Sequence, residues 1–121
     1  MPRAFDSSEP STALRIYLVL IGCAARNETI GYGDLARRVK RGGPNLLATP
    51  LDLITKWCTR WGQPQIASLV VEQATAFPAP GFNAVPRDRI PSEQARVFEY
   101  DWFSFFPPTV EELAKKDEAA N

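Results

Sequence analysis

Proline placement is the feature of this 121-residue chain that most restricts its fold, because most of its eleven prolines lie from Pro44 onward. Proline fixes φ and has no amide hydrogen, so it interrupts helices and is excluded from central strands. We therefore expect the second half of the chain to be broken into short elements. The length suits one domain over residues 1–121, in which residues 1–7 and 115–121 are expected to be flexible.

The first half of the chain predicts two helices joined by a short extended stretch. Apolar residues at helical spacing indicate a first helix that begins between Ser8 and Ser11, where a serine can cap it, and ends near residues 26–27. An extended stretch at residues 29–30 and a glycine turn come next. The second helix is expected to begin near Asp34, since an acidic residue is favoured at a helix start, and the sequence RGGPN ends it.

A third helix is predicted to begin at residue 46 or at the 49–50 cap and to stop at Gly62. The spacing of its apolar residues indicates one buried face. Trp57 and Trp61, one turn apart, are interpreted as members of that face and of the core.

The run of residues 66–72 is rich in β-branched side chains and predicts a strand. Residues 73–81 contain two prolines and cannot form a central strand, so they are interpreted as a loop or wing, which could include a short return strand.

Helical character returns after Ser92, which can cap a helix with Ala95, Phe98 and Trp102 on one face. The sequence TVEE near the C-terminus has the pattern of a capping box and predicts a last short helix.

This order of elements is that of a winged helix: helix, short strand, two helices, strand and wing-like loop. We expect an α+β fold, a small winged-helix-like domain with a three-helix core, short strands and a wing, followed by a C-terminal helical aromatic segment. Such a unit leaves one helix face free to enter a DNA groove.

Composition argues against several kinds of chemistry. The chain has 14 basic and 14 acidic residues, and this neutrality disfavours strong nonspecific binding to polyanions. It has no histidine, and its two cysteines, Cys23 and Cys58, lie in apolar helical patterns typical of reduced core residues. With no zinc-ligand set, no histidine base and no glycine-rich phosphate loop, we expect no metal, no cofactor and no catalytic role.

Nothing in the sequence predicts a secretion signal or a membrane span. The N-terminal MPRAFDSSEP lacks an apolar core, and the apolar run IYLVLIGCAA is too short to cross a bilayer. We therefore expect a cytoplasmic protein without membrane contact.

The segment GYGDLARRV resembles the helix–turn segment of the DNA-binding domain in alkylguanine-DNA alkyltransferases and alkyltransferase-like proteins. In this resemblance Tyr32 takes the place of the family's DNA-contacting tyrosine. The family's Pro-Cys-His-Arg active site is absent, and GQPQIASLVV stands in that region. The resemblance therefore implies a winged-helix fold without alkyl transfer. The stretches QIASLVV and FEYDWFSFFPP are also similar to small uncharacterised bacterial proteins.

The leading hypothesis is a non-catalytic module, such as a regulator, that binds duplex DNA. It requires basic residues from two separate helices to converge on one exposed face. Asp52, on the same face of the third helix, would repel phosphate. We expect the groove to be contacted by Lys56, Thr59 and Arg60, and the phosphates by Tyr32, Arg37, Arg38, Lys40 and Arg41.

The alternative hypothesis is a protein-interaction adaptor or inhibitor built on the same fold, and net neutrality favours it. Closely spaced aromatic residues can form an exposed patch that binds a protein partner. Its surface would combine the wing and the C-terminal aromatic segment through Phe77, Phe82, Trp102, Phe103 and Phe105.

Overall fold

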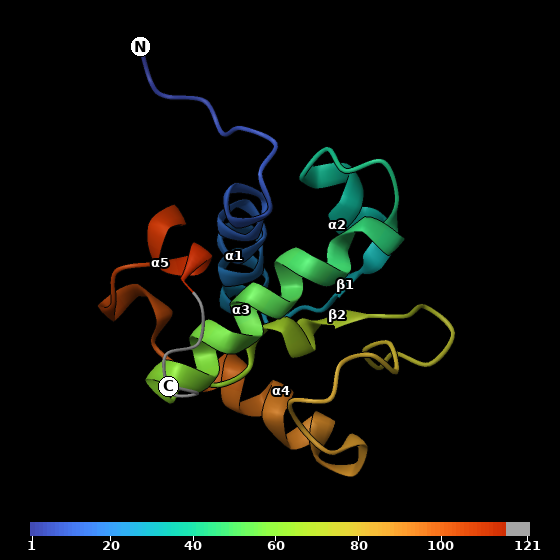
Figure 1. The fold of residues 1–121 in the computed structure, drawn as a ribbon. Helices are drawn as coiled ribbons and strands as arrows, with labels where there is room; N and C mark the ends of the chain where they lie inside the picture. The colour runs from blue at the N-terminus through green and yellow to red at the C-terminus, as the bar shows by residue number, and fades with distance from the viewer. Residues whose placement is uncertain (116–121) are drawn as a thin grey trace.

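The computed structural model describes residues 1–115 and shows a largely helical α+β arrangement (Figure 1). Residues 116–121, most of the C-terminal stretch predicted to be flexible, lie outside the described part. Residues 1–7 form no helix or strand. The helices are α1 (Glu9–Ala25), α2 (Tyr32–Arg38), α3 (Ala48–Trp61), α4 (Ile90–Glu99) and α5 (Val110–Ala114), the strands are β1 (Ile30–Gly31) and β2 (Val70–Val71), and 3₁₀ turns cover Pro44–Leu47, Ile66–Leu69, Arg87–Arg89 and Trp102–Ser104.

Helix α1 is the centre of the core, and its predicted limits are confirmed. The Ser8 side chain accepts a hydrogen bond from the Ser11 amide at 3.2 Å and caps the helix start. Ile16 and Leu20 are fully buried on one face. Helix α1 packs against α3, α5 and the 3₁₀ turn at Ile66–Leu69, and Figure 1 shows α3 running across it.

The predicted strand over residues 66–72 is mostly wrong. Only Val70 and Val71 are strand, paired in parallel with Ile30 and Gly31 of β1. The preceding residues form the 3₁₀ turn at Ile66–Leu69. A short apolar run predicts burial but does not distinguish a strand from another buried segment. Strand β1 can offer only two residues for pairing, because α2 begins directly after it.

The loop after β2 was interpreted as a wing, and it forms no return strand within the described residues. The Glu72 amide donates to the carbonyl of Phe77 at 2.8 Å, and the Ala76 amide donates to that of Glu72 at 2.8 Å. These bonds close a tight turn, in which Ala76 has a φ of 60°.

Helix α4 begins two residues before the predicted cap. Its first residue is Ile90, and the Ser92 hydroxyl donates to the carbonyl of Arg89 at 2.9 Å. The predicted apolar face is confirmed only in part. Phe98 packs against the core and Trp102, beyond the helix end, is buried. Ala95 is exposed, however, and the buried residues of α4 are Ile90, Glu93 and Val97. Ile90, the first residue of the helix, is 2% exposed.

The prediction that Trp61 belongs to the core is wrong, although Trp57 is half-buried. Trp61 is the last residue of α3, and its ring packs on Trp57 with centroids 5.7 Å apart. Gly62 then adopts a left-handed φ of 67° and turns the chain away, as predicted. Cys23 and Cys58 are buried and free, which confirms their assignment to the core.

Candidate functional site

Two exposed regions of the fold are candidates for function, and the first is a cleft between α2 and α3. The cleft has a volume of about 1030 Å³. The start of α2 forms one wall, the first half of α3 forms another, and the loop after β2 closes a third side. Tyr32 and Arg37, both predicted DNA contacts, line it together with Leu51, Thr55 and Phe82.

Tyr32 holds the loop after β2 against the start of α2. Its hydroxyl oxygen accepts a hydrogen bond from the Ala79 amide at 2.8 Å. Burial raises the pKa of the Tyr32 phenol. The Tyr32 side chain is thus half-buried, and its hydroxyl is already bonded to the Ala79 amide.

The exposed cations of α2 and α3 are matched by carboxylates on the same helices. Asp34 lies 3.3 Å from Arg37 and 3.5 Å from Arg38, and Asp52 lies 3.1 Å from Lys56. Exposed pairs at this helical spacing contribute only about 0.3–0.5 kcal/mol, so the arginines and the lysine can move to other partners. The carboxylates remain, however, and reduce the attraction of this face for phosphate.

Acidic residues also outnumber basic residues along the cleft. Asp34, Asp52 and Glu72 line it, whereas Arg37 supplies the positive charge among the lining residues. Arg37 of α2 therefore lines the cleft, but the α3 residues that line it include Asp52 and no lysine or arginine, so cations from the two helices do not meet there.

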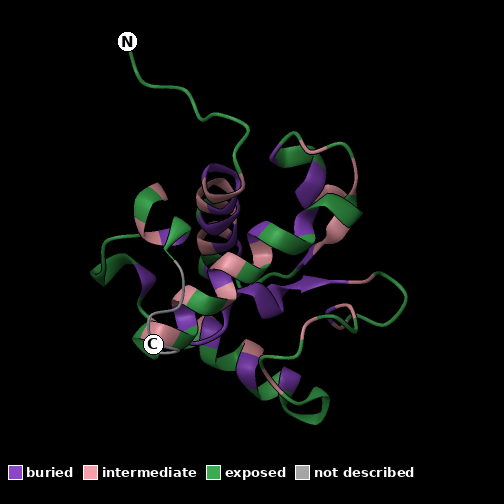
Figure 2. Ribbon diagram, viewed as in Figure 1, coloured by how far each residue is buried: buried purple, intermediate pink, exposed green. Residues whose placement is uncertain are grey.

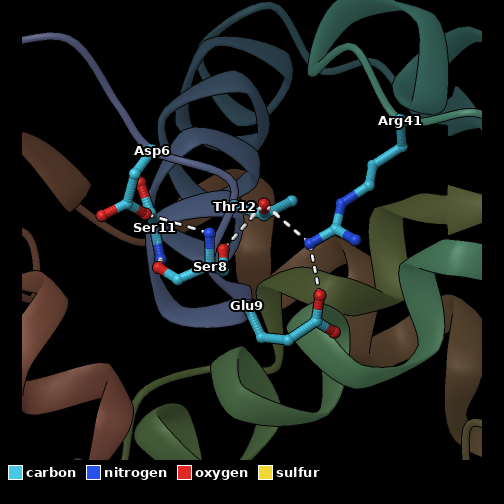
Figure 3. A network of polar contacts seen from close by, with 6 residues as sticks. All are labelled: Asp6, Ser8, Glu9, Ser11, Thr12 and Arg41. Carbon is cyan, nitrogen blue, oxygen red and sulfur yellow. Dashed lines mark hydrogen bonds and ion pairs between the residues drawn. The ribbon is translucent and has the colours of Figure 1, made fainter.

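Arg41 points inward, away from a position where it could contact a phosphate (Figure 3). Its guanidinium donates to a Glu9 carboxylate oxygen and, at 2.8 Å, to the Thr12 hydroxyl, and its side chain is 18% exposed. This contact fixes the segment after α2 to the start of α1. The predicted phosphate contact of Arg41 therefore does not fit the observed geometry.

The remaining predicted DNA contacts, Lys40, Thr59 and Arg60, differ in their exposure and in their contacts. Lys40 is exposed just after α2, where it has a φ of 60°. The Thr59 hydroxyl accepts a hydrogen bond from the Gln65 side chain at 2.9 Å, and Arg60 is half-buried on α3.

The second region is the chain between α4 and α5, which is largely exposed (Figure 2). Phe103 is 76% exposed, Phe105 56% and Phe106 95%, and Trp61 at the end of α3 is 60% exposed. We call Phe103, Phe105 and Phe106 the aromatic surface.

Trp102 does not belong to this surface, contrary to the partner-binding hypothesis. It is 5% exposed, its indole N–H donates to the carbonyl of Val97 at 2.8 Å, and its ring packs edge-on against Tyr17 at 6.1 Å. The predicted partner surface also divides in two: Phe77 lies under Arg87 at 4.7 Å and Phe82 lines the cleft, both on the loop after β2.

Buried residues hold the aromatic surface in place at both ends. Trp102 anchors its start, while Pro108 and Leu113 are buried after it. The Tyr100 ring lies 4.5 Å from Trp102 and 5.7 Å from Phe105, on which it stacks. The side-chain amide of Gln63 donates a hydrogen bond of 3.4 Å to the Tyr100 hydroxyl. This bond joins the segment to the chain just after α3, two residues beyond Trp61.

Sequence reasoning left Phe106 out of the expected partner-binding residues and placed Trp61 in the core. The sequence nevertheless holds a signal for the exposure of each. Phe106 precedes two prolines, which favour an extended backbone outside any helix. Trp61 directly precedes the glycine that ends α3, so its position on the apolar face was no guarantee of burial.

Within residues 1–115, no group of three or more His, Cys, Asp or Glu side chains is arranged to hold a metal ion. No described helix is long and apolar enough to cross a membrane. Comparison of the chain with protein-family models, curated proteins and solved structures gives no match.

Proposed function

We propose that this chain is a non-catalytic module that binds another protein through its aromatic surface. The observation that carries the proposal is that Phe103, Phe105 and Phe106 face solvent on a segment fixed by buried neighbours. Aromatic side chains are enriched at the centres of protein interfaces.

The exposure of the phenylalanines and the rigidity of their segment both favour binding. Burying a phenylalanine side chain contributes about 1.5–3 kcal/mol relative to leaving it exposed, and three such side chains are unburied here. Because Trp102 and Pro108 already hold the backbone, a partner would lose little affinity to ordering this segment.

Site-directed crosslinking tests the proposal. The photoreactive residue p-benzoylphenylalanine would be introduced at position 103 or 106 in the native cells, with position 46 as matched control. Leu46 is 46% exposed and lies in the 3₁₀ turn beside α2. We expect a discrete crosslinked protein from positions 103 and 106 only. The partner identified in this way, once purified, should bind the Phe103→Ser/Phe106→Ser variant at least about tenfold more weakly than the Leu46→Ser variant. Equal crosslinking from all three positions, or equal binding by the two variants, would reject the proposal.

Duplex DNA binding is the second candidate. It is supported by the convergence of Arg37 and the α3 face on one cleft, and by the resemblance of GYGDLARRV to a DNA-binding segment. The acidic lining of that cleft is why we place it second. A mobility-shift titration at rising salt would test it, with Lys56→Glu/Arg60→Glu as the variant. A salt-sensitive shift by the native chain, lost in that variant, would favour DNA over a protein partner.

A further inference from the structure

The segment that carries the aromatic surface is strongly acidic. Between residues 97 and 114 the chain has no lysine or arginine. It has four carboxylates there, at Glu99, Asp101, Glu111 and Glu112, so acidic residues flank the three exposed phenylalanines on both sides in the sequence.

Most of these carboxylates are available to a partner. Glu99, Asp101 and Glu111 are exposed, and none of the three forms an ion pair within residues 1–115. Asp101 accepts a hydrogen bond from the Ser104 hydroxyl, which leaves acceptor positions open. Glu112 differs, since its carboxylate accepts from the Thr109 amide at 3.0 Å in the capping box. The surface thus contrasts with α2 and α3, where Asp34 and Asp52 are paired.

From this charge pattern we infer that the partner of the aromatic surface is a peptide segment in which apolar side chains are flanked by lysine or arginine. The inference rests on the proposed function and adds the chemical class of the partner. Apolar side chains would cover the phenylalanine rings, and the flanking cations would meet Glu99, Asp101 and Glu111. Complementary charge at the rim of an interface accelerates association and discriminates against acidic partners.

Charge also argues against a second copy of the chain as the occupant. In a two-fold symmetric dimer the same surface patch is used by both subunits. Pairing this surface with itself would place Glu99, Asp101 and Glu111 near their own copies, and like charges brought together at an interface are unfavourable.

Three labelled peptides of one alternating pattern test the inference by fluorescence anisotropy: leucine with lysine, with glutamine, or with glutamate. At low salt we expect the Leu/Lys peptide to bind the full chain at least about tenfold more tightly than the Leu/Gln peptide. Neutralising the rim in Glu99→Gln/Asp101→Asn/Glu111→Gln should remove most of that preference. Phe103→Ser/Phe106→Ser should abolish binding with its charges intact, and Leu46→Ser is the matched control. Circular dichroism of each variant verifies that it is folded.

Each alternative result has a defined meaning. Equal binding of the Leu/Lys and Leu/Gln peptides, or no binding of either, overturns the basic partner class, while crosslinking from positions 103 and 106 can still succeed. Leu/Lys binding that survives Phe103→Ser/Phe106→Ser is nonspecific attraction and also overturns the inference. If the native chain dimerises and the Phe103→Ser/Phe106→Ser variant does not, the occupant of the surface is a second copy of the chain, and the inference is overturned.

Discussion

The Tyr32 hydroxyl and the Ala79 amide, 47 positions apart in the chain, form a 2.8 Å hydrogen bond that joins the start of α2 to the loop after β2. Tyr32→Phe keeps the ring and removes this acceptor. We expect a loss of about 0.5–1.5 kcal/mol in the free energy of unfolding and faster hydrogen exchange at the Ala79 amide. Unchanged protection of that amide in the variant would show that the bond does not hold the loop in solution.

Arg41 is expected to stabilise the fold, whereas Arg37 is not. Arg41→Ala removes the guanidinium that bridges Glu9 and Thr12 and should cost about 1–2 kcal/mol, because the hydroxyl and carboxylate of α1 lose a charged partner. Arg37→Ala is the control, since that side chain is 76% exposed and its change should stay within about 0.5 kcal/mol. Urea denaturation measures both, and equal losses would contradict the assignment.

Substitution of Trp102 should destabilise the fold, whereas substitution of Phe106, only four residues away, should leave its stability almost unchanged. Trp102→Phe removes the indole N–H that donates to Val97 and leaves a void beside Tyr17, so we expect a loss of about 1–3 kcal/mol. Phe106→Ser should change stability by less than about 0.5 kcal/mol because its side chain is in solvent. Denaturation followed by far-ultraviolet circular dichroism compares them, and a large loss in Phe106→Ser would show that this ring is buried.

Stability is expected to fall as the pH rises above 9. Burial raises the pKa of the Cys58 thiol from 9.0 to about 12 and also raises that of the Tyr17 phenol. The unfolded chain therefore loses these protons at a lower pH than the folded chain, so alkaline conditions favour unfolding. One such group contributes a slope of up to about 1.4 kcal/mol per pH unit.

Chemical denaturation between pH 8 and 11 measures that slope, and Cys58→Ala provides the control because alanine does not titrate. The variant should be less stable at pH 8 but should lose stability less steeply above pH 9. Parallel slopes for the native chain and the variant would mean that Cys58 does not contribute to the alkaline loss.

Helix-forming periodicity and end signals predicted the regular part of this fold. The start of α1 follows from the Ser8 cap, and the end of α3 follows from Gly62. The strand at residues 66–72 was overestimated because the length of a ladder is set by the partner strand. Strand β1 has only two residues, and no local property of residues 66–72 records that length.

The candidate surfaces were harder to predict, since they depend on which side chains converge. The spacing of Phe98 and Trp102 indicated that Trp102 faces inward, but no periodicity in the sequence indicated that Phe103 and Phe105 face outward. In the basic run of residues 37–41, the sequence likewise did not indicate that Arg41 bonds to α1 while Arg37 lines the cleft. Both outcomes depend on contacts with residues distant in the sequence.

The brevity of the β1–β2 ladder also limits how other chains can associate with this protein. Each strand has two residues, so in the described part of the chain the sheet presents almost no row of open backbone donors and acceptors. Fibril growth and the addition of a peptide strand to a sheet both require such a row. Within residues 1–115 the sheet is therefore a poor acceptor for an added strand and a poor template for amyloid-like assembly.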